Sequence, residues 1–314
     1  MRVLITGGNG YVGRTLTRLL SADHEVGVLD NLRYGQMRLT PDDLSRIRFY
    51  GEDLRDANDV ADVVDDFKPE AIVHLAAIHF IPECEKDPEN AIATNVTGTL
   101  NLLRAAKKGT RFILASTAAV YAPEDRPHHE EHSAIGPMDV YGYTKLHAEH
   151  YVTHWTKQAG LRSVIVRLFN VIGPGETNPH ILPAIMAQAL RGDRLRLGNC
   201  HPKRDYIDVD DVAAGFRAVL LGNPADTDVD VVNLGTGCAY SVYDIVERLA
   251  LVAGRAFSVE TDPTRVRPSD RPFLAADISR IRRRYGWTPT RHLKDSLQSL
   301  WSNPDIPHDL LAVS

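Results

Sequence analysis

Cysteines and long apolar runs are both scarce in this sequence, and each shortage narrows the class of protein. The 314 residues include only Cys84, Cys200 and Cys238, without a C-x-x-C spacing. An odd, scattered set argues against a disulfide framework or a cysteine zinc site and fits a reducing cytosol. No apolar run reaches membrane-spanning length, and the chain opens on a β-type stretch instead of a secretory leader. We therefore expect a cytoplasmic protein with no membrane partner.

Positive charge is not in excess either. Lys and Arg number 36 against 41 Asp and Glu, which gives a formal net charge of −5. This balance favours neither a nucleic-acid partner nor an anionic membrane. With 43% hydrophobic and 25% charged residues, the composition is that of an ordinary globular protein. The length suits one large domain or two interleaved ones.

A glycine-rich turn follows the first apolar run, Val3 to Ile5, and a helical pattern begins near Tyr11. Three glycines with a spacing of three permit a tight turn, a close approach of pyrophosphate and close helix packing. The N–H groups at the helix start would face the phosphates, although an isolated match could also be a flexible turn. The residues expected to bind a dinucleotide here are Gly7, Gly10, Tyr11, Val12 and Gly13.

An acidic residue ends the second apolar run, Glu25 to Asp30. A carboxylate at Asp30 suits the two ribose hydroxyls of an unphosphorylated adenosine and repels a 2′-phosphate, which favours NAD over NADP even though Arg33 lies close. A turn-initiating carboxylate is the alternative for Asp30. Asp53 and Leu54 follow the third expected strand, where an adenine could rest. A helix-start carboxylate is the alternative for Asp53.

Short apolar runs alternate with helical patterns through the first half of the chain. This alternation predicts a Rossmann-type, doubly wound parallel α/β sheet that binds ligands beyond the carboxyl ends of its strands. Further strands are expected at 46–50, 71–77, 111–116 and 162–169, helices at 57–67, 88–108 and 141–158, and a loop at 31–45. The strand at 71–77 ends in small residues that let a cofactor lie against the backbone, so Leu75, Ala76 and Ala77 are expected contacts.

The alternation of apolar runs and helical patterns stops after residue 172, where several glycines and prolines lie in one short segment. We assign 1–172 to the NAD-binding Rossmann domain, with a return of about 205–235 into it. We assign 173–204 and 236–314 to a smaller, mostly helical C-terminal lobe for the substrate.

A possible catalytic group follows the fifth expected strand. Tyr141 and Lys145 are four residues apart and so share one helix face, although Y-x-x-x-K alone could be a surface pair. A nearby ammonium and a positive nicotinamide would favour the phenolate, so we expect a lowered pKa for Tyr141. Tyr141 could then take a proton from a sugar hydroxyl while Lys145 also binds the nicotinamide ribose. Thr117, with Ser116 beside it, would orient the hydroxyl and relay its proton.

These motifs together resemble those of the extended short-chain dehydrogenases/reductases, specifically the nucleotide-sugar epimerase/dehydratase family. The resemblance covers essentially the whole chain. Its markers are Thr6-Gly-Gly-Asn-Gly-Tyr-Val-Gly13, Leu29-Asp-Asn31, His74-Leu-Ala-Ala77, Asn95-Val-Thr-Gly98, Ser116-Thr117, Tyr141-x-x-x-Lys145, Arg167-Leu-Phe-Asn170, Arg204-Asp-Tyr-Ile207 and Asn233-Leu-Gly-Thr-Gly237.

The resemblance implies further binding residues and a homodimer formed through helices near 90–108 and 142–158. Asn31 and Asn95 would contact the cofactor. Asn170 and the segment through His180, Ile181 and Leu182 would face a nucleotide diphosphate. Arg204 and Arg267 would pair with that diphosphate, and Asp270 would reach the nucleotide ribose. From sequence chemistry alone, both arginines could be solvated surface charges.

One departure from the family pattern separates the possible activities. Relatives that eliminate water carry an Asp-Glu pair where this chain has Ala118 and Ala119, and methyl groups cannot transfer protons. We therefore expect an NAD-dependent 4-epimerase for a UDP-hexose or UDP-hexuronic acid, acting through a 4-keto intermediate. The alternatives are a dehydratase or decarboxylase with atypical acid/base groups and, in another class, a non-catalytic dinucleotide-sensing protein.

The thirteen histidines give no metal-ligand spacing on a rigid element, so no metal site is expected. His128, His129 and His132 are expected in a solvated loop. His79 follows the cofactor-lining Ala77 and is expected to meet the substrate, and His201 falls in the expected nucleotide region.

Overall fold

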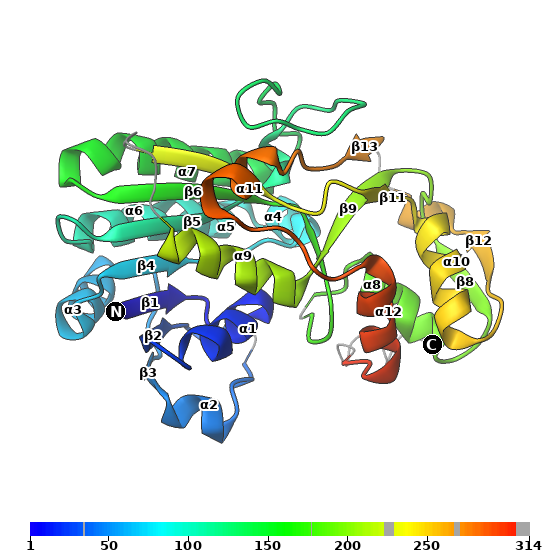
Figure 1. The fold of residues 1–314 in the computed structure, drawn as a ribbon, viewed down its shortest axis with the longest axis horizontal. Helices are drawn as coiled ribbons and strands as arrows, with labels where there is room; N and C mark the ends of the chain where they lie inside the picture. Colours follow the sequence, from blue (N-terminus) through cyan, green and yellow to red (C-terminus); the bar gives the residue numbers. More distant parts are fainter. Residues whose placement is uncertain (34, 177, 223–228, 267–270, 306–314) are drawn as a thin grey trace.

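The computed structural model describes residues 1–33, 35–176, 178–222, 229–266 and 271–305. These residues form a larger α/β domain, which holds the N-terminus, and a smaller lobe beside it (Figure 1).

A parallel sheet of seven strands forms the centre of the larger domain, in the order β10-β6-β5-β4-β1-β2-β3. The chain proceeds outward from β1 in one direction through β2 and β3, and in the other through β4, β5 and β6. The strands are β1 (Arg2–Thr6), β2 (Glu25–Leu29), β3 (Ile47–Tyr50), β4 (Ala71–His74), β5 (Arg111–Thr117), β6 (Arg162–Leu168) and β10 (Val229–Leu234). The predicted doubly wound fold is thus confirmed, and the reversal between β1 and β4 marks where a ligand crevice belongs.

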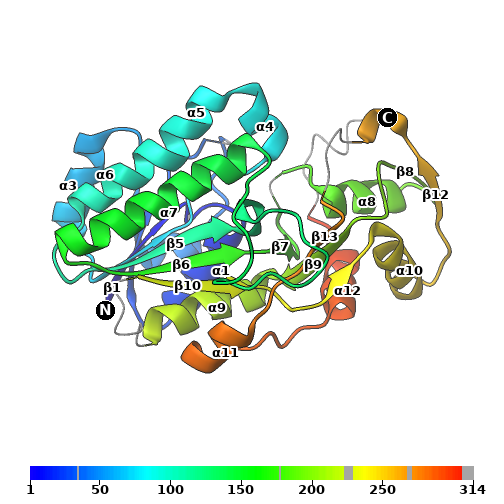
Figure 2. The same ribbon diagram turned by 90° about the horizontal axis from the view of Figure 1, so that it is seen from above.

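Helices cover both faces of this sheet, as Figure 2 shows. α3, α6 and α7 pack together on one face, whereas α1 packs against α9 on the other. They are α1 (Tyr11–Leu20), α3 (Ala57–Phe67), α6 (Gly98–Ala105), α7 (Val140–Ala159) and α9 (Val209–Leu221), with the short α2 (Pro41–Ser45) in the expected loop. Leu16 and Leu20 of α1 are fully buried while Leu19 is exposed, which is the amphipathic pattern of a helix lying on a sheet.

The single long helix predicted at 88–108 is wrong in detail. The chain forms α4 (Ile81–Lys86), α5 (Pro88–Ile92), a π-helical turn (Ala93–Thr97) and then α6. The π turn carries Asn95, whose buried side chain reaches the backbone of Ile78. A wider turn preserves the apolar pattern on either side of it, so the spacing of hydrophobic residues did not reveal it.

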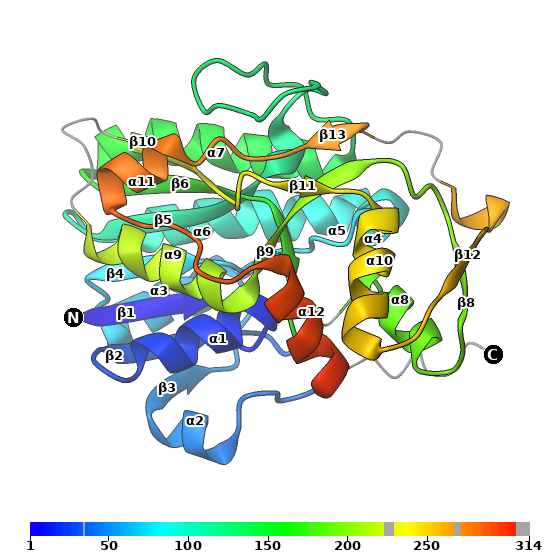
Figure 3. The same cartoon turned by 45° about the vertical axis from the view of Figure 1, so that its right-hand side comes forward.

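The smaller lobe is built from helices and two small sheets that the sequence did not indicate (Figure 3). β9 pairs with β7, β11 and β13, and β8 pairs with β12. The lobe elements are β7 (Asn170–Ile172), α8 (Ile181–Ala189), β8 (Arg194–Leu197), β9 (Lys203–Asp208), β11 (Ala239–Tyr240), α10 (Val242–Ala253), β12 (Ser258–Thr261), β13 (Phe273–Leu274) and α12 (Leu293–Ser302). A separate buried cluster, which includes Ile185, Leu249 and Leu297, forms its core.

Part of the segment expected in the lobe belongs instead with the larger domain. α11 (Ser279–Tyr285) packs against β10, and its Ile281 joins Val232 in one buried cluster. The buried carboxylate of Asp230 in β10 holds this helix, because Arg280 pairs with it at 2.9 Å. The predicted boundary at 236 is therefore wrong for α11: nothing in the basic helix itself identifies its acidic partner on a strand about fifty residues earlier.

Two glycines of the first turn are required by the packing. Gly7 has a φ of +71°, and a Cβ there would lie 2.8 Å from the backbone of Ala76. A Cβ on Gly13 would lie 2.0 Å from the carbonyl oxygen of Gly7, so only glycine lets α1 start this close to the turn. The turn therefore leaves open the space in which a pyrophosphate would lie against α1.

Gly13→Ala tests this packing. The added methyl group has no room, so we expect a loss of about 1–3 kcal/mol in the free energy of unfolding, measured by urea denaturation, together with loss of NAD binding. Gly192→Ala is the matched control, because no atom lies within 4 Å of a Cβ there, and its free energy of unfolding should stay within about 0.5 kcal/mol. Equal stability of the two variants would contradict the packing.

Candidate active site

A cavity of about 1120 Å³ lies at the carboxyl ends of the central strands, between the larger domain and the lobe. The glycine turn, the segment after β4, the end of β5 and the start of α7 line one side, and the β7–α8 segment and β9 line the other. Its volume slightly exceeds the roughly 300–1,000 Å³ of a typical small-molecule site. The cavity therefore has room for a dinucleotide together with a second ligand.

The residues expected at the phosphate end lie in the cavity wall. Gly7, Gly10, Val12 and Gly13 line it where α1 begins. Tyr11 also lines it, but its hydroxyl donates to the carbonyl oxygen of Gly173 at 2.9 Å. Burial raises the pKa of Tyr11 well above its ordinary value, so it is a neutral donor that ties α1 to the start of the lobe.

The carboxylate of Asp30 stands at the end of β2 and lines the same cavity. It accepts hydrogen bonds from the backbone N–H groups of Asn9 (3.0 Å) and Leu32 (2.9 Å). Asn31 donates to Asp53 at 3.0 Å, and both also line the cavity. These acceptors suit ribose hydroxyls and disfavour a 2′-phosphate.

The apolar residues that the sequence predicts to contact the cofactor also lie in the cavity wall. Leu54, Leu75, Ala76 and Ala77 all line the cavity. Asn95 does not: its amide is fully buried, accepts from the N–H of Ile78 at 2.8 Å, and donates to the Ile78 carbonyl and to Thr144. These bonds join the π turn to the loop after β4 and to α7, and the expected cofactor contact of Asn95 stays a prediction.

Tyr141 and Thr117 both line the cavity. Asp139 caps α7 by accepting from the N–H of Gly142 at 2.7 Å, which places Tyr141 in the first turn. Thr117 ends β5, and its hydroxyl acts on the Tyr141 phenol in the direction that lowers the pKa of Tyr141. Lys145 lies one turn further along α7, is 1% exposed and also lines the cavity.

In the protein without a cofactor, burial has the largest effect on the pKa values of Tyr141 and Lys145. It raises the pKa of Tyr141, and this effect exceeds the lowering by the Thr117 hydroxyl. In the protein alone, desolvation therefore disfavours the phenolate more than its neighbours favour it, and the lowering expected with the nicotinamide in place stays a prediction. Burial also lowers the pKa of Lys145 to about 8, although the carboxylate of Glu149 acts in the opposite direction.

Ser116 faces a different partner from the one expected. Its hydroxyl donates to Glu149, which also accepts two bonds from Arg167 at 3.0 and 2.7 Å. The Arg167 guanidinium in turn lies 4.8 Å from the centre of the Tyr121 ring. Ser116 and Arg167 thus hold Glu149 in place, one helical turn beyond Lys145. The direct catalytic role expected for Ser116 stays a prediction.

The lobe supplies most of the residues expected to meet the substrate. Those that line the cavity with Thr117 are His79, Asn170, His180, Ile181, Leu182 and Arg204. Arg204 is a β9 residue whose guanidinium donates to the Lys203 carbonyl at 2.9 Å. Arg267 and Asp270 lie outside the described residues. His201 packs against Tyr243 and is absent from the described cavity lining.

Arg271 and Glu176 are among the charged residues of the cavity wall that the sequence analysis missed. Arg271 is buried and donates to the carbonyl oxygens of Ala119 (2.9 Å) and Tyr121 (3.3 Å), which fixes the lobe against the turn after Thr117. Glu176 projects from the β7–α8 segment. Nothing in the sequence distinguished Arg271 from the neighbouring arginines, and a lone glutamate in a glycine-rich segment carried no signal.

The loop that carries His128, His129 and His132 is less exposed to solvent than expected. His128 is fully buried and stacks on Tyr121, with ring centres 4.7 Å apart. Its neighbours His129 and His132 stack on each other at 4.4 Å. The expectation was wrong for His128 because the loop folds back on the larger domain, where the His128 N–H donates to the Ala275 carbonyl at 2.8 Å.

In the part of the chain that the structure describes, no helix combines the length and the apolar character that a bilayer crossing needs.

Comparison with known proteins identifies the class. Residues 3–235 match the model of the NAD dependent epimerase/dehydratase family, and the chain belongs to this family. The family confirms NAD as the expected cofactor and makes the protein an NAD-dependent enzyme of the epimerase/dehydratase type.

Individual relatives span nearly the whole chain. The UDP-glucose 4-epimerase of Lactobacillus helveticus is 30% identical over 322 residues, covering 96% of each chain. The GDP-6-deoxy-D-mannose reductase of Pseudomonas aeruginosa is 30% identical over 315 residues, again covering 96% of each. The solved UDP-glucuronic acid 4-epimerase of Bacillus cereus, in complex with UDP-glucuronic acid and NAD, has a TM-score of 0.87 at 27% identity and covers 96% of this chain and 98% of that one.

The Lys145–Glu149 pair makes a testable prediction about protonation. In protein labelled with ¹⁵N-lysine, Lys145 should titrate near its lowered pKa of about 8, well below the ordinary 10.5. Glu149→Gln removes the attracting charge and should lower that pKa further. Ser116→Ala keeps the charge of Glu149 and is the control that should leave the titration unchanged. Titration of Lys145 at its ordinary pKa, or the same curve in Glu149→Gln, would contradict this account.

Proposed function

We propose that the protein is an NAD-dependent nucleotide-sugar 4-epimerase that acts on a UDP-hexose or UDP-hexuronic acid through a 4-keto intermediate. The observation that carries the proposal is that Thr117, Tyr141 and Lys145 line one cavity, with Tyr141 and Lys145 on the same helix and two alanines beside Thr117 in the cavity wall. This group can move one proton at one carbinol. Ala118 and Ala119 supply no acid or base for eliminating water.

Different residues of the chain would bind the cofactor and act on the sugar hydroxyl. Gly7, Gly13 and Asp30 would hold the pyrophosphate and adenosine ribose of NAD, which when bound accepts a hydride from the sugar carbon and returns it. Thr117 would hold the C4 hydroxyl and Tyr141 would take its proton. Lys145 would stabilise the phenolate and bind the nicotinamide ribose.

Inversion at C4 requires the keto sugar to present its other face before the hydride returns. Ala118 and Ala119 are buried small residues beside Thr117, and they leave space for that rotation. On the lobe side, Arg204 would pair with the diphosphate and Asn170, His180, Ile181 and Leu182 would surround it. The nucleotide is thus held at a distance from the reacting carbon while the sugar turns. Arg267 and Asp270 complete this proposed set.

The named relatives support a UDP-linked substrate. The Lactobacillus helveticus relative is a UDP-glucose 4-epimerase, and the Bacillus cereus structure contains UDP-glucuronic acid with NAD. One relative favours a second candidate, the reduction of a GDP-linked 4-keto-6-deoxy sugar, because the Pseudomonas aeruginosa protein is a GDP-6-deoxy-D-mannose reductase. The same tyrosine could give a proton instead of taking one. The acidic environment at Asp30 disfavours NADPH, on which family reductases usually depend.

We also propose a homodimer formed through the surface of α5 and α7. These helices contact each other and expose Ile92, Tyr143 and Tyr151, which are 40–52% accessible. A row of large apolar side chains on adjacent helices suits an interface between two copies.

Incubation of the purified protein with UDP-glucose, UDP-glucuronic acid and GDP- and dTDP-sugars, followed by NMR of the products, tests the function. We expect a new 4-epimer of a UDP-sugar with no net NADH. Loss of water or carbon dioxide would favour a dehydratase or decarboxylase. Net oxidation of NADH or NADPH with a GDP-linked 4-keto sugar would favour the reductase.

Tyr141→Phe tests the assigned base. This variant should fold and bind NAD but lose at least about 10²-fold in turnover, since it keeps the ring and removes the proton-accepting oxygen. Tyr143→Phe, two residues along α7 with an exposed ring, is the matched control and should retain activity. Undiminished turnover in Tyr141→Phe would refute the assignment.

A further inference from the structure

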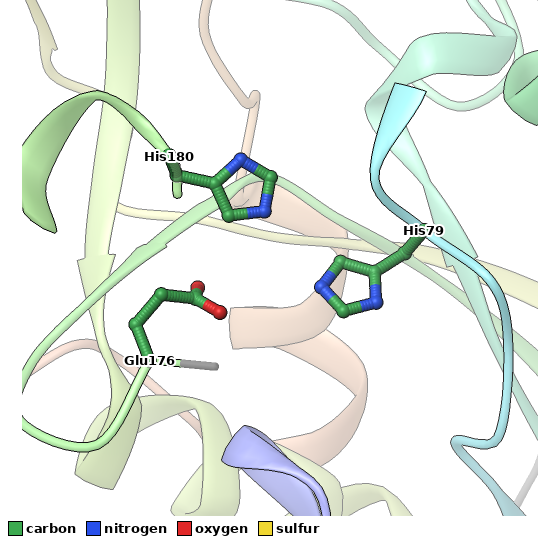
Figure 4. A group of neighbouring side chains, drawn as sticks. All are labelled: His79, Glu176 and His180. Atoms are coloured by element: carbon green, nitrogen blue, oxygen red, sulfur yellow. The ribbon is translucent and has the colours of Figure 1, made fainter. Parts of the chain in front are cut away.

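Three side chains capable of binding a metal converge in the cavity wall. His79 comes from the loop after β4, and Glu176 and His180 come from the segment between β7 and α8. Each offers one ligand atom, and these atoms all lie within 4.8 Å of one another. Figure 4 shows both imidazole rings and the carboxylate pointing toward a common space. Among the described residues, no other three His, Cys, Asp or Glu side chains meet this distance.

We propose that His79, Glu176 and His180 form a binding site for a divalent transition-metal ion of the Zn²⁺ class. Two imidazole nitrogens and one carboxylate oxygen are a ligand set that Zn²⁺ takes in proteins, with a fourth position open to water or another ligand. An all-oxygen set would have suited Mg²⁺ or Ca²⁺ instead. Since all three residues line the cavity, the open position faces the space where the substrate is proposed to bind.

The spacing is close to what such an ion needs. With metal–ligand bonds of about 2.0–2.1 Å, ligand atoms of a tetrahedral site lie about 3.3–3.4 Å apart. The two rings are 5.7 Å apart between centres with planes inclined by 30°, and two imidazoles on one tetrahedral Zn²⁺ have centres roughly 5–5.5 Å apart. The ligand atoms therefore need to move by only about 1 Å to reach the spacing of a tetrahedral site.

Each ring is held in an orientation that suits binding. The Nε2 atom of His79 lies 3.2 Å from the amide nitrogen of Asn178. With the Asn178 amide as donor, Nε2 carries the lone pair that a metal ion needs. Phe80 packs edge-on against His180, with ring centres 5.3 Å apart. An ion would take over the Nε2 lone pair from Asn178.

The hydrogen bond between Glu176 and the backbone of Asn178 is compatible with metal binding. One of its carboxylate oxygens accepts from the N–H of Asn178 at 3.0 Å. A carboxylate has about four lone-pair positions, so this bond and a bond to a metal are compatible. The bond fixes the carboxylate beside the two rings. The site is therefore partly ordered before an ion arrives, which reduces the entropy cost of binding.

Metal binding to the full-length protein tests the proposal without any measurement of turnover. Protein freed of metals with a chelator is titrated with Co²⁺, whose visible absorption reports tetrahedral coordination, and with Zn²⁺, whose stoichiometry after dialysis is measured by mass spectrometry. We expect one ion per chain, absorption typical of a tetrahedral nitrogen–oxygen site, and a higher melting temperature with Zn²⁺.

Variants show whether these three residues hold the ion. Glu176→Gln and His180→Ala should each weaken Zn²⁺ binding by more than about 100-fold while leaving NAD binding and the circular dichroism spectrum unchanged. His132→Ala, which removes one ring of the stacked pair with His129, is the control and should bind as the parent does. The absence of stoichiometric binding, or equal affinity in both cluster variants and the parent, would overturn the proposal. Because NAD binding and metal binding are measured separately, failure of the epimerase assay alone would leave this result unaffected.

Discussion

The burial of the Tyr141 phenol against Thr117 is the constraint on which the rest of the site depends. A phenol out of water is a weak acid and a stable hydrogen-bond partner, so the resting protein keeps its proton. What can change this balance is positive charge brought close to the ring. Lys145 provides a charge that Glu149 supports, and the cofactor of the family would bring another. The fold thus places the proposed base, Tyr141, where the positive charge of a bound cofactor would favour its ionisation.

The topology explains why these groups meet. Thr117 ends a central strand and Tyr141 starts the following long helix, while the glycine turn ends β1, so all three reach the same edge of the sheet. Arg271 and the Tyr11–Gly173 bond then tie the lobe to this edge. The cavity is consequently bounded by the larger domain on one side and by the lobe on the other.

Local sequence patterns were enough to predict the central sheet and the residues that lie at its edge. Glycine spacing, the acid at Asp30 and the Tyr141–Lys145 pair each have a short-range physical meaning, so strand and helix context sufficed. The sequence could not predict features that depend on distant partners: the buried bonds of Asn95, the packing of α11 through Asp230, and the meeting of His79 with Glu176 about a hundred residues later. The effect of burial on the pKa of Tyr141 could not be predicted for a related reason, because burial is a property of the whole fold.

The most direct test of this account is the pKa of Tyr141 itself, followed by NMR in protein labelled with ¹³Cζ-tyrosine, with and without NAD. The account predicts a pKa above the ordinary value of 10 in the protein alone and a clear fall when NAD is bound. The Tyr141 resonance is assigned by its absence in Tyr141→Phe. A phenol already ionised at neutral pH without NAD, or one whose pKa does not respond to NAD, would contradict the account.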